Sequence, residues 1–302
     1  MSLHKKITII SNPNIAIIKY WGKENIEENI CSNQSISFQL TKLTTTTSIS
    51  FSKDGDEFIF NGDKCKLNNK IKFIIELFKE TVKNNQPIRI ESINNFPHSC
   101  GIASSASGFS ALVKALDKFY GTNFSEQDLS ILARRCSGSA SRSIPCDIVL
   151  CNKISSRSID KWEEIKIFLI NLDGTPKKVS STEGMCRTQE TSFFYKERLT
   201  RIDDKIELCI EYIKSKDHQS LFKMIMRESN EIHSIMFESY PPIRYINDKG
   251  FEVMEIVHEI NKNEIKVAYS FDAGTNPFIF VLKKDIEEVL KNFKDYNIIE
   301  CN

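Results

Sequence analysis

The sequence predicts an α+β protein built from two lobes, and two observations support this prediction. In the first half, short segments rich in Ile and Thr alternate with turn formers such as Asn-Pro-Asn and Asp-Gly, as strands do. From about residue 182 the pattern changes to long stretches with apolar residues at helical spacing. A chain of 302 residues can hold two ordinary domains, so we expect one lobe over residues 1–181 and another over 182–302.

The first lobe is expected to be rich in strands. Asp54-Gly55 is typical of a hairpin turn and predicts that the strands on either side of it are joined there. Strands are expected at residues 5–11, 15–20, 34–40, 44–52, 57–61, 87–93, 146–152 and 165–172. Helices are expected at residues 68–82, where Ile71, Ile74, Ile75 and Phe78 form one apolar stripe, and at 127–135, after a capping-box pattern at Ser125 to Asp128.

The second lobe is expected to be rich in helices. Apolar spacing predicts helices at residues 193–214, 220–238 and 248–260. Strands are expected at residues 265–271 and 278–282, followed by a helix and a last strand near Ile298.

Residues 94–109, reading Asn-Asn-Phe-Pro-His-Ser-Cys-Gly-Ile-Ala-Ser-Ser-Ala-Ser-Gly-Phe, predict a strand end, a sharp bend and the start of a helix. The first N–H groups of a helix have no internal partners, and small side chains let a phosphate approach them closely. Such starts are also common as simple caps, with Ser104 or Ser105 as the N-cap residue. No G-x-x-x-x-G-K-[ST] motif occurs in the chain, so this is not a Walker A loop.

Composition excludes several classes of function. Lys and Arg number 41 against 40 Asp and Glu, a balance that argues against a nucleic-acid partner. No apolar run reaches the roughly 18 to 20 residues that would span a membrane, and the N-terminus leads into a strand without a secretory segment. The nine cysteines are scattered without a C-x-x-C pair, which indicates free thiols in a reducing, cytoplasmic compartment.

Four segments, at residues 12–23, 94–109, 137–142 and 271–276, together resemble the mevalonate diphosphate decarboxylase family of the GHMP kinase superfamily. Taken singly, two lysines near a strand end are usually solvated, and an Asp-x-Gly turn is mostly just a turn. In the family's order, the matching motifs are N-I-A-x-x-K-Y-W-G-K at 14–23, N-x-S-I-S at 33–37, N-F-P-x-x-x-G-x-A-S-S-A-S at 95–107, S-G-S-A-x-R-S at 137–143 and D-A-G-x-N at 272–276.

The resemblance implies the two-lobed GHMP kinase fold, with the active cleft between the lobes and an ATP-phosphate loop at residues 97–107. It implies ATP-dependent decarboxylation of mevalonate 5-diphosphate to isopentenyl diphosphate, CO2, ADP and phosphate, with ATP and Mg required and the 3-hydroxyl phosphorylated first. The family commonly forms homodimers. Two alternatives stay open: a mevalonate or phosphomevalonate 3-kinase or decarboxylase of the same superfamily, and a GHMP-fold binding module without catalysis.

The resemblance also implies roles for individual residues. Asp272 would orient or deprotonate the tertiary hydroxyl, Arg142 would hold the substrate carboxylate, and Lys19 would supply positive charge near the transferring phosphoryl group. Substrate contacts are expected from Asn14, Tyr20, Trp21, Gly22, Lys23, Lys70, Ser137, Gly138, Ser139, Ala140, Ser141, Arg142, Thr191 and Ser192. ATP contacts are expected from Ser99, Gly101, Ala103, Ser104, Ser105 and Ala106, with Ser104 and Ser105 also near Mg.

The sequence departs from the family pattern in places. After Arg142-Ser143 the family usually continues through a Gly-Gly segment, whereas this chain has Ile144-Pro145-Cys146-Asp147, and Thr275 replaces the usual Pro. The first change lies behind Arg142, so it bears on substrate preference and leaves the reaction class as expected.

Overall fold

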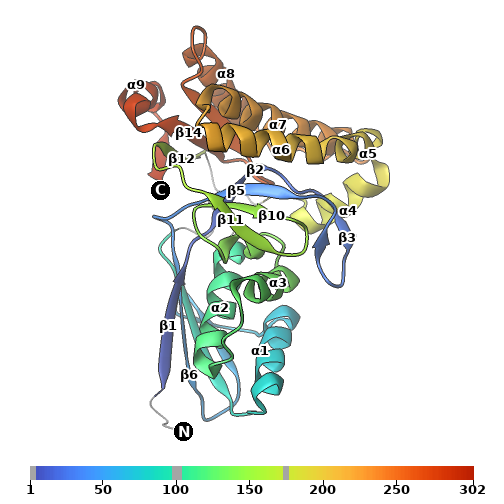
Figure 1. The fold of residues 1–302 in the computed structure, drawn as a ribbon, viewed down its shortest axis with the longest axis vertical. Coiled ribbons are helices and arrows are strands. Elements are labelled where there is room, and N and C mark those ends of the chain that lie inside the picture. The colour runs from blue at the N-terminus through green and yellow to red at the C-terminus, as the bar shows by residue number, and fades with distance from the viewer. Residues whose placement is uncertain (1–4, 97–103, 173–176) are drawn as a thin grey trace.

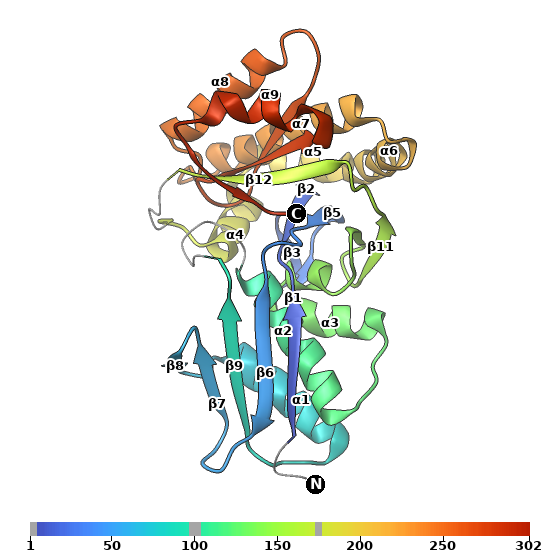
Figure 2. The ribbon, with the colours of Figure 1, turned by 90° about the vertical axis from the view of Figure 1, so that its left-hand side faces the viewer.

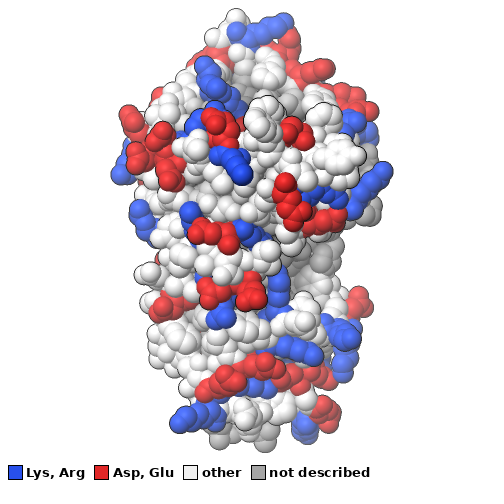
Figure 3. Space-filling view, turned by 90° about the vertical axis from the view of Figure 1, so that its right-hand side faces the viewer, with Lys and Arg blue, Asp and Glu red and all other residues white. Residues whose placement is uncertain are grey.

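The computed structural model describes residues 5–96, 104–172 and 177–302. It confirms an α+β protein with two lobes, which Figure 1 shows stacked along the longest axis of the molecule. The N-terminal lobe occupies the lower part of that view, and helices from the C-terminal half occupy the upper part. Among the described residues, no helix has both the length and the apolar character required to cross a bilayer. Acidic and basic side chains are interspersed over the face shown in Figure 3.

A five-stranded sheet forms the outer part of the N-terminal lobe. Its strand order is β1-β6-β9-β7-β8, and Figure 2 shows β9, β6 and β1 side by side with helices behind them. The bounds are β1 Lys6–Ser11, β6 Thr45–Phe51, β7 Glu57–Phe60, β8 Asp63–Cys65 and β9 Ile88–Asn94. The helices are α1 Asn69–Val82, α2 Ser104–Tyr120 and α3 Glu126–Cys136, whose apolar faces pack with Ile49, Ile88 and Ile90 of the sheet.

The predicted hairpin at Asp54-Gly55 is wrong. Strand β9 lies between β6 and β7, and β7 pairs with β9 in parallel, so the two strands flanking the turn are not neighbours. Strand β9 has seven residues and pairs with β6 along its whole length, from Asn94 opposite Thr45 to Ile88 opposite Phe51. Because β7 has only four residues, all of them half-buried, the longer strand forms the more extensive ladder with β6.

A second, four-stranded sheet lies in the middle of the molecule. Its order is β11-β10-β5-β2, with bounds β2 Asn14–Ile18, β5 Ser35–Gln39, β10 Ile148–Cys151 and β11 Ser156–Asp160. Every residue of β2, β5 and β10 is buried, because layers of structure cover both faces of this sheet. A small ribbon of β3 Lys23–Asn25 and β4 Ile30–Cys31 and a 3-10 turn, η1 Ala140–Ser143, lie beside it.

The C-terminal lobe combines a third sheet with helices. The sheet order is β13-β14-β12-β15, with bounds β12 Ile165–Asn171, β13 Val267–Phe271, β14 Pro277–Leu282 and β15 Asn297–Glu300. The helices are α4 Ser181–Thr191, α5 Phe193–Thr200, α6 Ile202–Ser215, α7 His218–Glu238, α8 Asp248–Ile260 and α9 Ile286–Leu290, with short 3-10 turns η2 Lys283–Asp285 and η3 Lys291–Phe293. One apolar core joins this lobe to the middle sheet, since Ile15 and Ile17 of β2 belong to the same cluster as Phe222 and Phe280.

The helix expected over residues 193–214 is two helices, because Arg201 interrupts it at φ −108° and ψ 0°. Helix α5 turns the polar side chain of Arg198 inward, so its buried face does not continue the apolar stripe of α6. Helix α4 was not expected: its buried residues are Gly184, Met185 and Thr188, which give little apolar signal. The lobe boundary after residue 181 stays a prediction; strand β12, which precedes that residue, pairs within the C-terminal sheet.

Candidate active site

A cleft of about 1110 Å³ is lined by residues from both lobes. The N-terminal lobe contributes the segment after β2, the start of α2, residues 137–139 and Arg142, while the C-terminal lobe contributes the start of α4, the end of α7 and the turn after β13. The three residues expected to be catalytic, Lys19, Arg142 and Asp272, all line this cleft. The structure therefore brings together three residues that lie far apart in the sequence.

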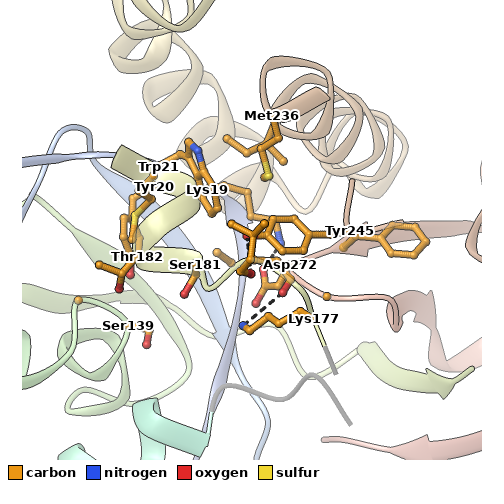
Figure 4. A pocket seen from close by; sticks show the side chains of 18 of the residues that line it. Lys19, Tyr20, Trp21, Ser139, Lys177, Ser181, Thr182, Met236, Tyr245 and Asp272 are labelled. Atoms are coloured by element: carbon orange, nitrogen blue, oxygen red, sulfur yellow. Dashed lines mark hydrogen bonds and ion pairs between the residues drawn. The ribbon is translucent and has the colours of Figure 1, made fainter. Parts of the chain in front are cut away.

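Lys19 and Asp272 form an ion pair at the centre of the cleft, as Figure 4 shows. Lys19 Nζ lies 2.6 Å from Asp272 Oδ1, and Lys19 is 5% exposed. Burial lowers the pKa of Lys19, and the carboxylate of Asp272 partly opposes that effect. The side chain of Asp272 is 31% exposed, so its carboxylate can be reached from the cleft while it holds Lys19.

Arg142 is held rigidly at the cleft wall. Its Nε donates to Asn14 Oδ1 at 3.0 Å and its Nη1 donates to Ser35 Oγ at 3.1 Å. The guanidinium carbon lies 5.1 Å from the centroid of the Tyr20 ring, within the range of a cation–π contact. Burial raises the pKa of Tyr20 far above its usual range, so the Tyr20 hydroxyl stays protonated at neutral pH.

The segment from Lys19 to Lys23 is held by hydrogen bonds from both lobes. Trp21 N donates to Asn33 Oδ1 at 3.2 Å, and Tyr195 Oη of helix α5 donates to the carbonyl of Trp21 at 3.0 Å. Lys23 N donates to Gln189 Oε1 of helix α4 at 2.8 Å. The polar residues of this segment are thereby fixed relative to the C-terminal lobe.

Gly22 leaves no room for a side chain, so Gly22→Ala is expected to lower stability. Its φ is +95°, and a Cβ there would lie 2.0 Å from Tyr195 Oη. Gly55 has φ +112°, and a Cβ there would meet no atom of the described residues within 4 Å, so Gly55→Ala is a control that has the backbone strain but no steric clash. We expect Gly55→Ala to cost about 1 kcal/mol and Gly22→Ala at least about 2 kcal/mol of unfolding free energy. Urea denaturation measures both; equal losses would contradict the packing of Tyr195 on Gly22.

A buried charge cluster lies behind Lys19. Glu228 of α7 accepts from Arg198 of α5 and from Lys205 of α6, whose Nζ lies 2.6 Å from Glu228 Oε2. Glu231 also contacts both cations, at 2.9 and 2.7 Å. Burial acts to raise the pKa of Glu228, but Arg198 and Lys205 outweigh it and lower that pKa to about 2.

This pKa predicts how Glu228 affects stability against pH. Because the folded pKa lies below the usual value of 4.5, the stabilisation is complete above about pH 4.5 and is lost as the pH falls toward about 2. A shift of this size corresponds to about 3 kcal/mol. We expect the difference in unfolding free energy between the wild type and Glu228→Gln to be largest at pH 7 and to shrink below pH 4.5, measured by urea denaturation. A difference that stays constant from pH 7 to pH 3 would contradict the assignment.

A second polar region of the cleft fits a phosphorylated ligand. Lys23, Lys70, Ser137, Gly138 and Ser139 all line it. Burial lowers the pKa of Lys23, and the nearby charge of Lys70 lowers it further. The Ser105 and Ser137 hydroxyl oxygens lie 3.4 Å apart, so the start of α2 adjoins this region. Two lysines and several hydroxyl groups on one wall can bind a group with several negative charges.

Ser104 and Ser105 also line the cleft, at the N-terminus of helix α2. The other expected ATP contacts divide into two groups: Ala106 is fully buried, while Ser99, Gly101 and Ala103 lie outside the described residues. Within the described ranges no group of three His, Cys, Asp or Glu side chains is placed to hold a metal ion. Hydroxyls and a single carboxylate fit a Mg²⁺ ion that is held largely by nucleotide phosphates.

Several expected substrate residues do not line the cleft. Asn14 supports Arg142, and the Ser141 hydroxyl is engaged with Ser156 at 2.7 Å. Thr191 Oγ1 donates to the carbonyl of Arg187 at 2.7 Å, and the Ser192 hydroxyl donates to Glu238. Gly22 and Ala140 are likewise absent from the cleft wall, although Trp21 is part of it. Contact of these residues with substrate stays a prediction.

The sequence prediction missed one side of the cleft. This side is formed by residues before and within α4 and by others near the start of α8, namely Lys177, Lys178, Ser181, Thr182, Arg244, Tyr245 and Asp248. Lys177 Nζ donates to the carbonyl of Ala273 at 3.4 Å, next to Asp272. Burial lowers the pKa of Lys177, and the charge of Asp272 opposes this. The run Lys-Lys-Val-Ser-Ser-Thr at 177–182, basic and hydroxylated like the other cleft segments, is the signal that could have identified it.

Comparison with known proteins gives a consistent result. The diphosphomevalonate decarboxylase-like N-terminal domain matches residues 11–159, and the mevalonate 5-diphosphate decarboxylase C-terminal domain matches residues 167–301. The diphosphomevalonate decarboxylase of Gibberella zeae is 34% identical over 312 residues, covering 93% of this chain and 82% of the relative.

Solved structures agree in fold. The mevalonate diphosphate decarboxylase of Staphylococcus aureus has a TM-score of 0.91 at 31% identity, over 99% of this chain and 95% of that one. A structure of MDDEF in complex with MVAPP, AMPPCP and magnesium has a TM-score of 0.89 at 31% identity, over 97% and 95% of the two chains. The fold and cleft thus define a two-lobed enzyme of the GHMP kinase fold. Within that class, the chain belongs to the mevalonate diphosphate decarboxylase family.

Proposed function

We propose that the chain catalyses the ATP-dependent decarboxylation of mevalonate 5-diphosphate to isopentenyl diphosphate, CO2, ADP and phosphate. The observation that carries this conclusion is the Lys19–Asp272 ion pair, which shares its cleft with the rigidly held Arg142 in a chain of this family. A carboxylate can accept the proton of a hydroxyl group, and a buried guanidinium can hold a carboxylate. Both requirements of the reaction are met in one cleft.

In the first step, Asp272 accepts the proton of the tertiary 3-hydroxyl while that oxygen forms its bond to the γ-phosphorus of ATP. The bond from that phosphorus to the β-phosphate oxygen breaks, and ADP leaves with the electron pair. Lys19 lies 2.6 Å from Asp272 and supplies positive charge where negative charge develops. Mg²⁺, when bound with ATP, neutralises part of the charge on the phosphates, and Ser104 and Ser105 would contact it and them.

In the second step, the C3–O bond breaks and the phosphate leaves. The electron pair of the bond to the carboxylate forms the new double bond, and the carboxylate departs as CO2. Arg142 holds that carboxylate through its guanidinium, whose position Asn14 and Ser35 fix. The wall formed by Lys23, Lys70, Ser137 and Ser139 would bind the diphosphate, which stays unchanged throughout.

The reaction is tested by following ADP and CO2 together with ATP, Mg and each mevalonate phosphate as substrates. Equal amounts of ADP and CO2 from mevalonate 5-diphosphate are expected. ADP without CO2 would identify a 3-kinase instead, and absence of both would favour a binding module without catalysis. Lys19, Arg142 and Asp272 are all present in the cleft, which favours the decarboxylase over both alternatives.

We further propose that the chain is a homodimer in the cytoplasm, with free cysteines. Exposed aromatic side chains near the start of α5 and the end of α7 support a dimer, since Phe193 is 82% and Tyr240 78% exposed. Large exposed apolar groups are often covered by a partner. Light scattering coupled to size-exclusion chromatography tests this: the mass of a single chain, 34.7 kDa, would contradict it.

A further inference from the structure

The backbone of Lys19 is held at both of its polar atoms by buried, charged side chains from the C-terminal lobe. Lys19 N donates to Glu228 Oε1 at 2.9 Å. The carbonyl oxygen of Lys19 accepts from Arg198 Nη2 at 2.9 Å. Both Arg198 and Glu228 are 1% exposed, so neither hydrogen bond competes with bulk water. Asn33 Nδ2 also donates to the same carbonyl, at 3.0 Å.

These two side chains are also bound to one another. Arg198 Nη2 donates to Glu228 Oε1 at 2.5 Å, and Arg198 Nη1 donates to Glu228 Oε2 at 3.1 Å. The fork of the guanidinium thus fixes both oxygens of the carboxylate that accepts from Lys19. The pair and the backbone of Lys19 form a closed hydrogen-bonded ring that joins the residue directly after strand β2 to helices α5 and α7.

Compared with apolar packing at the same place, such a cluster brings little gain in stability. Burying charges costs desolvation free energy, and well-packed apolar residues of similar volume often stabilise a protein as well or better. Here two cations and two carboxylates lie directly behind the residue whose side chain reaches Asp272 in the cleft. Instead, the cluster holds the backbone N–H and the backbone carbonyl of Lys19. It thereby fixes the position from which the Lys19 side chain extends toward Asp272.

We propose that Arg198 and Glu228 are positioning residues that act through Lys19 and keep its Nζ on Asp272 and on the transferring phosphoryl group. This inference rests on the proposed decarboxylase function. Catalysis by positioned charge is sensitive to small displacements, because a shift of about 1 Å can cost a hundredfold in rate. If this pair no longer held the Lys19 backbone, the distance between Lys19 Nζ and the Asp272 carboxylate would vary.

The alternative is that the Arg198–Glu228 pair only stabilises the packing of α5 on α7. The chain offers a matched control variant that distinguishes these two explanations. Glu231 belongs to the same cluster and contacts Arg198 and Lys205, but makes no hydrogen bond to Lys19 among the described residues. Glu231→Gln and Glu228→Gln remove the same charge from the same cluster. Only the second changes a group that touches the Lys19 backbone.

Arg198→Lys is the main test variant, since a lysine keeps the positive charge between the two carboxylates but has a single nitrogen. That nitrogen cannot sit at the positions of both Nη1 and Nη2, so the two oxygens of Glu228 are no longer held together and the carboxylate that accepts from Lys19 N is free to turn. For folded Arg198→Lys and Glu228→Gln we expect kcat to fall about 10- to 100-fold with KM for ATP within about threefold of the wild type. Glu231→Gln should keep kcat within about threefold. Wild-type-like kcat in Arg198→Lys, or an equal loss in Glu231→Gln, would overturn the proposal.

A double variant distinguishes the positioning of Lys19 from a purely structural role of Arg198. It still tests the proposal if Glu228→Gln does not fold. Arg198→Lys is introduced into Lys19→Met, and the residual turnover of the two proteins is compared. If Arg198 acts through the Lys19 side chain, the second change should have no further effect, because coupled residues are non-additive. If it lowers residual turnover by the same factor as in the wild type, Arg198 acts independently of Lys19 and the proposal fails. An inactive wild type would instead contradict the proposed function.

Discussion

Asp272→Asn is expected to lower kcat about a thousandfold while leaving ATP binding nearly unchanged. The amide preserves the shape of the side chain but cannot take a proton from the tertiary hydroxyl. It also removes the negative charge 2.6 Å from Lys19 Nζ. Since Asp272 opposes the burial that lowers the pKa of Lys19, its loss lowers that pKa further and weakens the second charge that the first step uses.

The measurement is turnover followed as ADP and CO2 together, with ATP affinity determined separately by calorimetry. Asp295→Asn is the control, because Asp295 is an exposed carboxylate outside the residues that line the cleft. We expect Asp295→Asn to match the wild type in both measurements. Turnover close to that of the wild type in Asp272→Asn would exclude Asp272 as the group that activates the hydroxyl.

The elements that the sequence predicted well are those with local signals. Helix α8 has the predicted bounds, and Ser125 caps α3 by accepting from Asp128 N, as the capping-box pattern indicated. The pairing of the strands was harder to predict. Strand β9 lies between β6 and β7 in the sheet, yet in the sequence it comes after both of them and after helix α1. No pattern near the Asp54-Gly55 turn carries information about that later strand.

The functional site, too, was predicted from the sequence only in part. Motif resemblance placed Lys19, Arg142 and Asp272 correctly on one cleft, although Lys19 and Asp272 are 253 positions apart. It did not predict the inward direction of Arg198, which sits among the charged residues Lys196 and Glu197 of α5. A charged residue in such a run normally faces solvent. Only the packing of α5 on α7 decides that Arg198 meets Glu228 and the Lys19 backbone.

The structure also changes the reading of the residues around Arg142. Asn14 was expected to contact substrate, yet its Oδ1 accepts from Arg142 Nε, and its Nδ2 donates to the Ser143 hydroxyl at 2.8 Å. The hydrogen bonds from Nε to Asn14 and from Nη1 to Ser35 fix the plane of the guanidinium. A planar group fixed in this way is suited to grip a carboxylate with two parallel hydrogen bonds, which a flexible cation cannot do.

Arg142→Lys is therefore expected to lower kcat/KM for mevalonate 5-diphosphate about a hundredfold or more, although the charge is kept. A lysine has one nitrogen in place of the two, Nε and Nη1, that donate to Asn14 and Ser35 at 3.0 and 3.1 Å, and it offers a carboxylate only a point charge. The loss should fall mainly on the substrate, with KM for ATP nearly unchanged, because the ATP contacts are expected at the start of α2. Steady-state kinetics with each substrate varied in turn measures this.

The control for this prediction is Arg157→Lys, which makes the same chemical change on the exposed side of β11. It should leave both kinetic constants at their wild-type values. If Arg142→Lys kept wild-type kcat/KM, a point charge would suffice at this position. Binding of the carboxylate by two parallel hydrogen bonds would then be contradicted. A ratio of ADP to CO2 above one in Arg142→Lys would be the most specific result. It would mean that phosphorylation proceeds while the carboxylate, no longer gripped, fails to leave in step with the phosphate.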